Sequence, residues 1–230
     1  MNITDNDMRQ YIKNFFGHLK TVCVHKYWVF YYGCKLGIPV RAFFHDFSKF
    51  NPIEFFESVK YYQGGKSSPI NAAKADKGYS KAWQHHKGHN PHHYEHWTDK
   101  YDDGTVAIKM PWKYVMEMTA DYLGAARGYL GKDFSLYGEL EWWKRKLSTN
   151  PCIHEETKNL MTELFCTFAV AKTVYNQQNN WVLREGYENS TLFSNENVMN
   201  GKVLLNYSGY PFTEFVFQNI DDILSNDYYK

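Results

Sequence analysis

The side chains between residues 11 and 32 repeat with the period of one long helix. Apolar and aromatic residues recur at alternating steps of four and three, and two histidines share their stripe. The members of this stripe are Tyr11, Phe15, His18, Val22, His25, Val29 and Tyr32. Residues with this spacing lie on one face of an α-helix, which must be buried against a partner surface. We therefore predict a helix over residues 5–34, ended by Gly37 and Pro39, in a mainly α-helical fold.

Helical patterns continue through the first three quarters of the chain. Asn51 and Pro52 have the composition of a helix start, and Glu54 stands at capping-box spacing. Further helices are expected at 40–50, 52–63, 111–129, 136–147 and 152–175, with loops at 64–77 and 98–109. These segments predict a helical bundle in an all-helical domain, residues 1–178.

The composition changes after Asn180. Residues 203–207 and 212–217 have the pattern of two short strands around the turn at 208–211. We predict that residues 179–230 form a small α+β appendage of short strands and loops.

Composition excludes several classes of protein. The 230 residues are 43% hydrophobic and 18% aromatic, which argues against a disordered chain. The formal net charge of +1 argues against a nucleic-acid or membrane partner, and no apolar run reaches the ~18–20 residues of a membrane span. Because the four cysteines form no CxxC pair and the amino terminus lacks a signal-peptide pattern, we expect a cytoplasmic protein.

The adjacent pair His45 and Asp46 is the first candidate for chemistry. It lies in the predicted helix 40–50, on the side opposite an apolar face. That face comprises Val40, Phe43, Phe44 and Phe47. A neighbouring imidazole and carboxylate can share one ion, and this donor pair suits Mn, Fe or Zn better than Ca. The alternative is a hydrogen-bonded Asp–His pair at a helix surface.

These residues resemble the HD-domain superfamily of metal-dependent phosphohydrolases, including an uncharacterised HD-like family. The matching positions are His25, His45-Asp46, His85-His86 and Asp121. The string from His45 to Lys49 is similar to the His-Asp-x-Gly-Lys signature of some members, with Ser48 in place of Gly. The resemblance covers roughly residues 15–170 and implies an HD-like bundle.

The resemblance also implies a set of metal ligands. It assigns His25, His45, Asp46 and Asp121 to one ion, with His86 as an additional ligand. The implied cofactor is one or two divalent transition-metal ions (Mn, Fe, Co, Ni or Zn). Without the resemblance, a histidine such as His25 on an apolar stripe is ordinarily a core residue.

Six of the ten histidines lie between residues 85 and 96. His89, His92, His93 and His96 have the spacing of one face of a helix starting at Pro91. This face could hold a second metal ion, with His92 and His93 as its ligands, or bind phosphate when protonated. The alternative is a solvated, pH-sensitive lid.

Periodicity places Asp121 at the surface of the predicted helix 111–129. The apolar stripe of that helix leaves Asp121 on the other side, together with Glu117, Gly124 and Gly128. Only the resemblance assigns Asp121 to the metal. The two glycines could let another backbone or a substrate approach this side closely.

The predicted activity is hydrolysis of a small phosphate ester, nucleotides included, by metal-activated water. Lys49, one turn beyond Asp46, is expected to bind the phosphate; Lys26 and Arg41 are further candidates or ordinary surface cations. Glu117 could orient water or accept a proton. The alternatives are a di-iron oxygenase of the HD-like type and a non-catalytic protein that binds a nucleotide or a protein partner. A homo-oligomer is compatible with each of these three functions.

Overall fold

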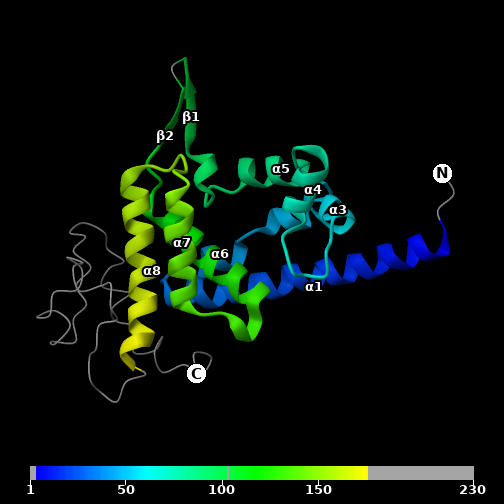
Figure 1. The fold of residues 1–230 in the computed structure, drawn as a ribbon, viewed down its shortest axis with the longest axis horizontal. Coiled ribbons are helices and arrows are strands. Elements are labelled where there is room, and N and C mark those ends of the chain that lie inside the picture. Colours follow the sequence, from blue (N-terminus) through cyan, green and yellow to red (C-terminus); the bar gives the residue numbers. More distant parts are fainter. Residues whose placement is uncertain (1–3, 103, 176–230) are drawn as a thin grey trace, which may run out of the picture.

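The computed structural model describes residues 4–102 and 104–175, and these residues form a mainly α-helical fold, as predicted (Figure 1). Within the described part of the chain, no helix is long and apolar enough to cross a membrane. The predicted appendage of residues 179–230, with its two strands, lies outside the described residues.

The long helix α1 spans Asp5–Lys35, close to its predicted bounds. Thr4 starts it with a capping box, in which its side chain accepts from the backbone of Asp7 and the Asp7 carboxylate accepts from the backbone of Thr4. The predicted stripe is buried from His18 onward, but Tyr11 is 43% exposed because α1 extends beyond the rest of the fold at its amino-terminal end (Figure 1).

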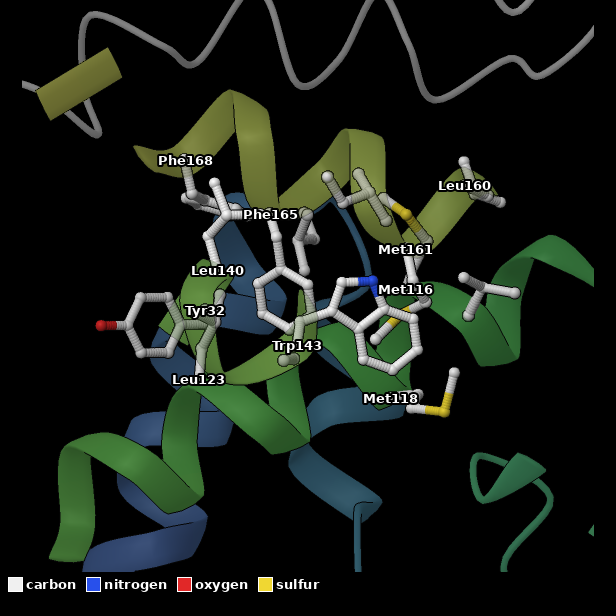
Figure 2. Packing of buried hydrophobic residues seen from close by; sticks show 14 of the residues in the cluster. Tyr32, Met116, Met118, Leu123, Leu140, Trp143, Leu160, Met161, Phe165 and Phe168 are labelled. Carbon is white, nitrogen blue, oxygen red and sulfur yellow. The ribbon is translucent and has the colours of Figure 1, made fainter. Parts of the chain in front are cut away.

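The main hydrophobic core lies between the carboxyl-terminal half of α1 and three later helices, α6 (Trp112–Leu130), α7 (Leu136–Ser148) and α8 (Glu155–Tyr175). The short 3-10 helix η3 (Gly131–Asp133) joins α6 to the segment before α7. Figure 2 shows Trp143 of α7 among Met116, Leu140 and Phe165. The Trp143 indole N–H donates to Thr162 Oγ1 at 2.9 Å, so this buried ring leaves no unpaired donor.

Gly124 sets the distance between α1 and α6. A Cβ atom at this position would lie 2.6 Å from Val29 Cγ2 and 2.8 Å from the Val29 nitrogen. A residue without a side chain is therefore required where the two helices pack. One turn away on each helix, this close packing brings Asp121 towards His25, which confirms the expectation that a backbone approaches the glycine side of α6.

The predicted helix 40–50 is wrong, because the chain breaks at the His-Asp pair. Helix α2 spans Pro39–Phe44 and the 3-10 helix η1 spans Phe47–Phe50. Between them His45 (φ −52°, ψ 134°) and Asp46 form a turn, in which Asp46 is left-handed (φ 54°, ψ 30°). This region is sparsely populated by residues other than glycine, although Asp is enriched in it. The break turns both side chains inwards.

The apolar face of this segment lies at the surface. Phe43 and Phe44 are 57% and 62% exposed, whereas His45 and Asp46 are 1% and 2% exposed. The polar side of the segment is therefore buried and the apolar side faces solvent.

Three further helices lie together beside α1 (Figure 1). They are α3 (Pro52–Lys60), α4 (Pro69–Lys77) and α5 (Lys81–His89), with α3 in contact with α1, α4 and α5. Helix α4 lies in the segment predicted as a loop, with Pro69 at its first position. Ser80 caps α5 by accepting from the Trp83 backbone N–H.

The chain after α5 differs from the prediction in two places. No helix begins at Pro91: residues 90–93 form a turn, and the 3-10 helix η2 covers only Tyr94–His96. The predicted loop 98–109 contains an antiparallel hairpin of β1 (Thr98–Tyr101) and β2 (Gly104–Ala107), which projects from the helices in Figure 1.

Candidate metal centre

The four side chains assigned to the first ion meet at one point. The ligand atoms of His25, His45, Asp46 and Asp121 all lie within 4.8 Å of one another, and all four residues are buried. His25 Nε2 lies 3.3 Å from Asp46 Oδ2 and 3.2 Å from Asp121 Oδ1. His45 Nε2 lies 3.0 Å and 3.4 Å from the same two oxygens. Helix α1, the break after α2 and helix α6 thus each contribute to this group.

A second group of ligands shares Asp46 with the first. Asp46, His86, His92 and His93 also place their ligand atoms within 4.8 Å of one another. His86 Nε2 and His92 Nε2 each lie 3.3 Å from Asp46 Oδ1. The two oxygens of Asp46 therefore face different groups, Oδ2 the first and Oδ1 the second.

Several atoms in these groups are buried without a hydrogen-bond partner. They are His45 Nε2, Asp46 Oδ1, His92 Nε2 and His93 Nε2. Each unsatisfied buried polar atom costs about 1–3 kcal/mol, so their convergence on two points needs a compensating ligand. Imidazole nitrogens together with carboxylate oxygens are a donor set that binds divalent transition metals, so these residues fit one or two such ions.

Glu117 orients two of the histidines. The Nδ1–H groups of His45 and His92 donate to Glu117 Oε1 at 3.1 Å and 3.3 Å, so that each Nε2 faces the ligand groups. Arg41 donates to Glu117 Oε2 at 3.1 Å, and its guanidinium lies over the ring of Tyr114. Arg41 and Glu117 thus lie on the Nδ1 side of these histidines, away from the two groups that the Nε2 atoms face.

Glu54 has the same role for the second group, and sequence reasoning missed it. His86 Nδ1–H donates to Glu54 Oε2 at 2.7 Å, and His85 Nδ1–H donates to Glu54 Oε1 at 2.6 Å. Asn51 does cap α3, by accepting from Ile53, but the Glu54 side chain is turned to the histidines. A carboxylate three residues after an N-cap gives no separate signal in the sequence.

The electrostatics of the centre keep its carboxylates ionised. Burial would raise the pKa of Asp46 and of Asp121, but the neighbouring His45 and His25 hold both pKa values well below the usual range. Burial also opposes ionisation of Glu117, whose hydrogen bonds from His45 and His92 nevertheless lower its pKa to about 2. Deprotonated carboxylates are the form that binds a metal.

Lys49 is the one predicted phosphate-binding residue that the structure places beside the ligands. Its Nζ lies 2.6 Å from Asp46 Oδ2. Burial would lower the Lys49 pKa, but the charges of Asp46 and Asp121 raise it, so the ammonium persists at neutral pH. Lys26 instead donates to the backbone carbonyls of His45 and Phe43 and holds the break between α2 and η1.

A cavity of about 240 Å³ adjoins the centre, between α1, α3, α4 and α6. One wall is made by His25, Lys49, Glu54, His86 and Asp121, which belong to the ligand groups or contact them. The other walls carry uncharged polar and apolar side chains, among them Thr21, Ser58, Ile70, Ala125 and Tyr129. The cavity therefore connects the candidate ligands to a largely neutral chamber.

His18 also lines this cavity and was not predicted as a site residue. It is 7% exposed, and its Nδ1 has no hydrogen-bond partner. Burial, and to a lesser degree the charge of Lys49, lower its pKa to about 4. His18 is thus a neutral imidazole at pH 7. Its place on the α1 stripe, two turns before His25, was the available signal.

The structure gathers all seven predicted metal ligands into the two groups: His25, His45, Asp46, His86, His92, His93 and Asp121. The remaining histidines of the 85–96 segment lie outside both groups. His85 is bound to Glu54, and His89 and His96 are exposed. The interpretation of residues 89–96 as one helical face is therefore wrong, although His92 and His93 lie together.

Comparison with models of known protein families finds a match over most of the chain. The model of a family described as "Family of unknown function (DUF5662)" matches residues 14–167, a range that contains every residue of both ligand groups. No curated protein matches the chain, and no solved structure matches it.

Proposed function

The chain belongs to DUF5662, a family of unknown function, and we propose that it is a metal-dependent phosphohydrolase of the HD type acting on a small phosphate ester, nucleotides included. One observation carries the proposal. Two groups of buried ligand atoms, several without a hydrogen-bond partner, share Asp46 beside a cavity that also contains Lys49.

Each group would hold one divalent ion. The first ion would be held by His25, His45, Asp121 and Asp46 Oδ2, and the second by His86, His92, His93 and Asp46 Oδ1. Mn, Fe, Co, Ni and Zn all accept these donors. When bound, such ions lower the pKa of water from ~15.7 towards ~7 and offset negative charge on a phosphate.

Glu117 and Glu54 orient the histidines for metal binding. Each accepts the Nδ1 proton of at least one imidazole, which fixes the tautomer with a free lone pair on Nε2. Arg41 offsets the negative charge of Glu117 through an ion pair with its other oxygen, Oε2. We assign Glu117 and Glu54 to positioning, because both carboxylates are turned to imidazoles.

Lys49 and the cavity define the expected substrate. The protonated Lys49 ammonium, which lies near the carboxylates of Asp46 and Asp121, would donate to a phosphate oxygen. The cavity, at about 240 Å³, is below the ~300–1,000 Å³ of sites for drug-sized ligands. A small organic group without charge suits its neutral walls, and its phosphate would lie at the end nearest Lys49.

The di-iron oxygenase remains a second candidate, because a shared carboxylate and several imidazoles also suit two irons. The presence of Lys49 at the cavity wall favours an anionic substrate and hence the hydrolase. Oxygen uptake by the iron-loaded protein, without release of phosphate from any ester, would support the oxygenase. Binding of a phosphate ester without turnover would support a non-catalytic role.

Metal content and phosphate release test the proposal together. The protein, purified without chelator, should retain one or two transition-metal ions per chain and release phosphate from members of a panel of phosphomonoesters. His45→Ala and Asp46→Ala should lose both properties while keeping their helical circular dichroism. His96→Ala is the matched control, because His96 is exposed and lies outside both groups. Full metal retention by His45→Ala or Asp46→Ala would refute the site.

A further inference from the structure

An exposed apolar face lies on the outer side of the segment that carries His45 and Asp46. We define the apolar face as Phe30, Val40, Phe43, Phe44, Phe47 and Phe50, which are 40–71% exposed. Its rings are contiguous: Phe43 contacts Phe30, Phe44 and Phe47, with centroid distances of 6.3, 5.2 and 6.3 Å. Phe50 continues the row at 6.3 Å from Phe47.

The apolar face is large enough for a specific protein interface. A phenylalanine contributes about 150–250 Å² when fully exposed, so the measured exposures correspond to roughly 600 Å² for the whole face. Two copies of the face would bury about 1,200 Å² in total, the lower end of the ~1,200–2,000 Å² of specific interfaces, and the face itself is at the upper end of the ~300–600 Å² that is usual for a monomer surface.

The charges around the apolar face disfavour a lipid surface. Arg41 is paired with Glu117, and Lys49 with Asp46. Lys26 is held by backbone carbonyls and lies 4.3 Å from the centroid of the Phe47 ring. Anionic headgroups would therefore find no uncommitted cation among these three, whereas a core depleted of charge and rich in aromatic rings is typical of protein–protein interfaces.

We propose that the apolar face binds the same face of a second copy of this chain in a two-fold symmetric dimer. A symmetric interface sets each surface against itself, so a surface carrying charge of one sign would repel its copy. This face carries no charged side chain among its six members. Dimer formation would remove its phenylalanines from water and cover the outer side of the break between α2 and η1.

The oligomeric state of the full chain tests this inference. Light scattering behind a sizing column, at loading concentrations from about 1 µM to about 100 µM, should show twice the monomer mass at the upper end. Phe44→Glu places a charge at the centre of the face and should reduce dimer formation at least tenfold. Val106→Glu is the matched control, because Val106 is also about half exposed but lies on the distant strand β2.

The dimer and the proposed function can fail separately. Phe44 points away from the ligands, so Phe44→Glu should keep its bound metal and its circular dichroism while losing the dimer. Without any substitution, amide deuterium uptake over residues 39–50 should fall as the wild-type concentration rises. A wild-type monomer at about 100 µM would overturn the inference. So would a dimer unaffected by Phe44→Glu, or binding of the monomer to neutral lipid vesicles through this face.

Discussion

Replacing His18 by leucine should stabilise the protein, and increasingly so as the pH falls. His18 lies on α1 with its ring 5.1 Å from the ring of Phe55, centroid to centroid, and its Nδ1 is buried without a partner. An unsatisfied buried nitrogen costs about 1–3 kcal/mol, which leucine removes at every pH. The native imidazole stays neutral because burial lowers its pKa.

The pH-dependent part follows from proton linkage. The His18 pKa is about 4 in the folded chain, against 6.5 for an ordinary histidine. Between these values the unfolded chain binds more protons, so folding stability is full above pH 6.5 and declines as the pH falls towards 4. A difference of about 2.5 pKa units at ~1.4 kcal/mol each gives a loss of about 3 kcal/mol in the wild type. His18→Leu has no such loss.

Urea unfolding followed by circular dichroism between pH 7 and pH 4.5 measures this difference. Both proteins are treated with chelator, so that release of metal at low pH does not enter the comparison. The free-energy difference between His18→Leu and wild type should grow by about 2–3 kcal/mol over this range. His96→Leu is the control, because His96 is exposed and its replacement removes no buried group.

A constant difference between His18→Leu and wild type across the pH range would refute the reasoning. It would mean that the folded protein accommodates a protonated His18, through water or a carboxylate that reaches its ring. A destabilised His18→Leu at pH 7 would refute the other half, since it would show that Nδ1 has a partner whose loss matters.

Three further predictions concern other parts of the fold. Glu117→Gln should weaken metal binding about 10–100-fold in competition with a chelating indicator, with unchanged helix content, because it loosens two ligand imidazoles. Burial raises the pKa of Glu139 from 4.5 to about 7, so its ionisation lowers the free energy of unfolding as the pH rises through this interval. Urea titrations should therefore show Glu139→Gln more stable than wild type by up to about 3 kcal/mol at pH 8, and by much less at pH 5. Gly124→Ala should lower the free energy of unfolding by about 1–3 kcal/mol in thermal unfolding. Gly88→Ala should not, because a Cβ atom at Gly88 would have no atom within 4 Å outside its own helix backbone and chain neighbours.

The parts of the structure that local periodicity determines were predictable. Helix α1 was predicted within one residue at its carboxyl end, because a long alternation of steps of four and three has few other interpretations. The place of His45 and Asp46 in a candidate ligand group was accessible through the resemblance, because the adjacent pair alone also fitted a hydrogen-bonded pair at a helix surface. The contributions of Glu54 and Glu117 to histidine orientation were not accessible, since they depend on contacts between residues 25 to 72 positions apart.

The exposed apolar face of residues 40–50 and the buried Asp121, which periodicity places at the surface, have a common physical cause. Hydrophobic patterning assumes that the apolar side of a segment faces the core, which holds when the core is apolar. Here part of the interior is polar, so the segment around His45 turns its ligands inwards and leaves its phenylalanines outside. Helix α6 contacts α8 as well as α1, so it is buried on its apolar stripe and also on the side of Asp121. A segment with candidate ligands on one side and exposed aromatic side chains on the other therefore indicates two features. Its inner side faces a polar centre, and its outer side binds a partner. Both proposals made for this chain rest on that arrangement.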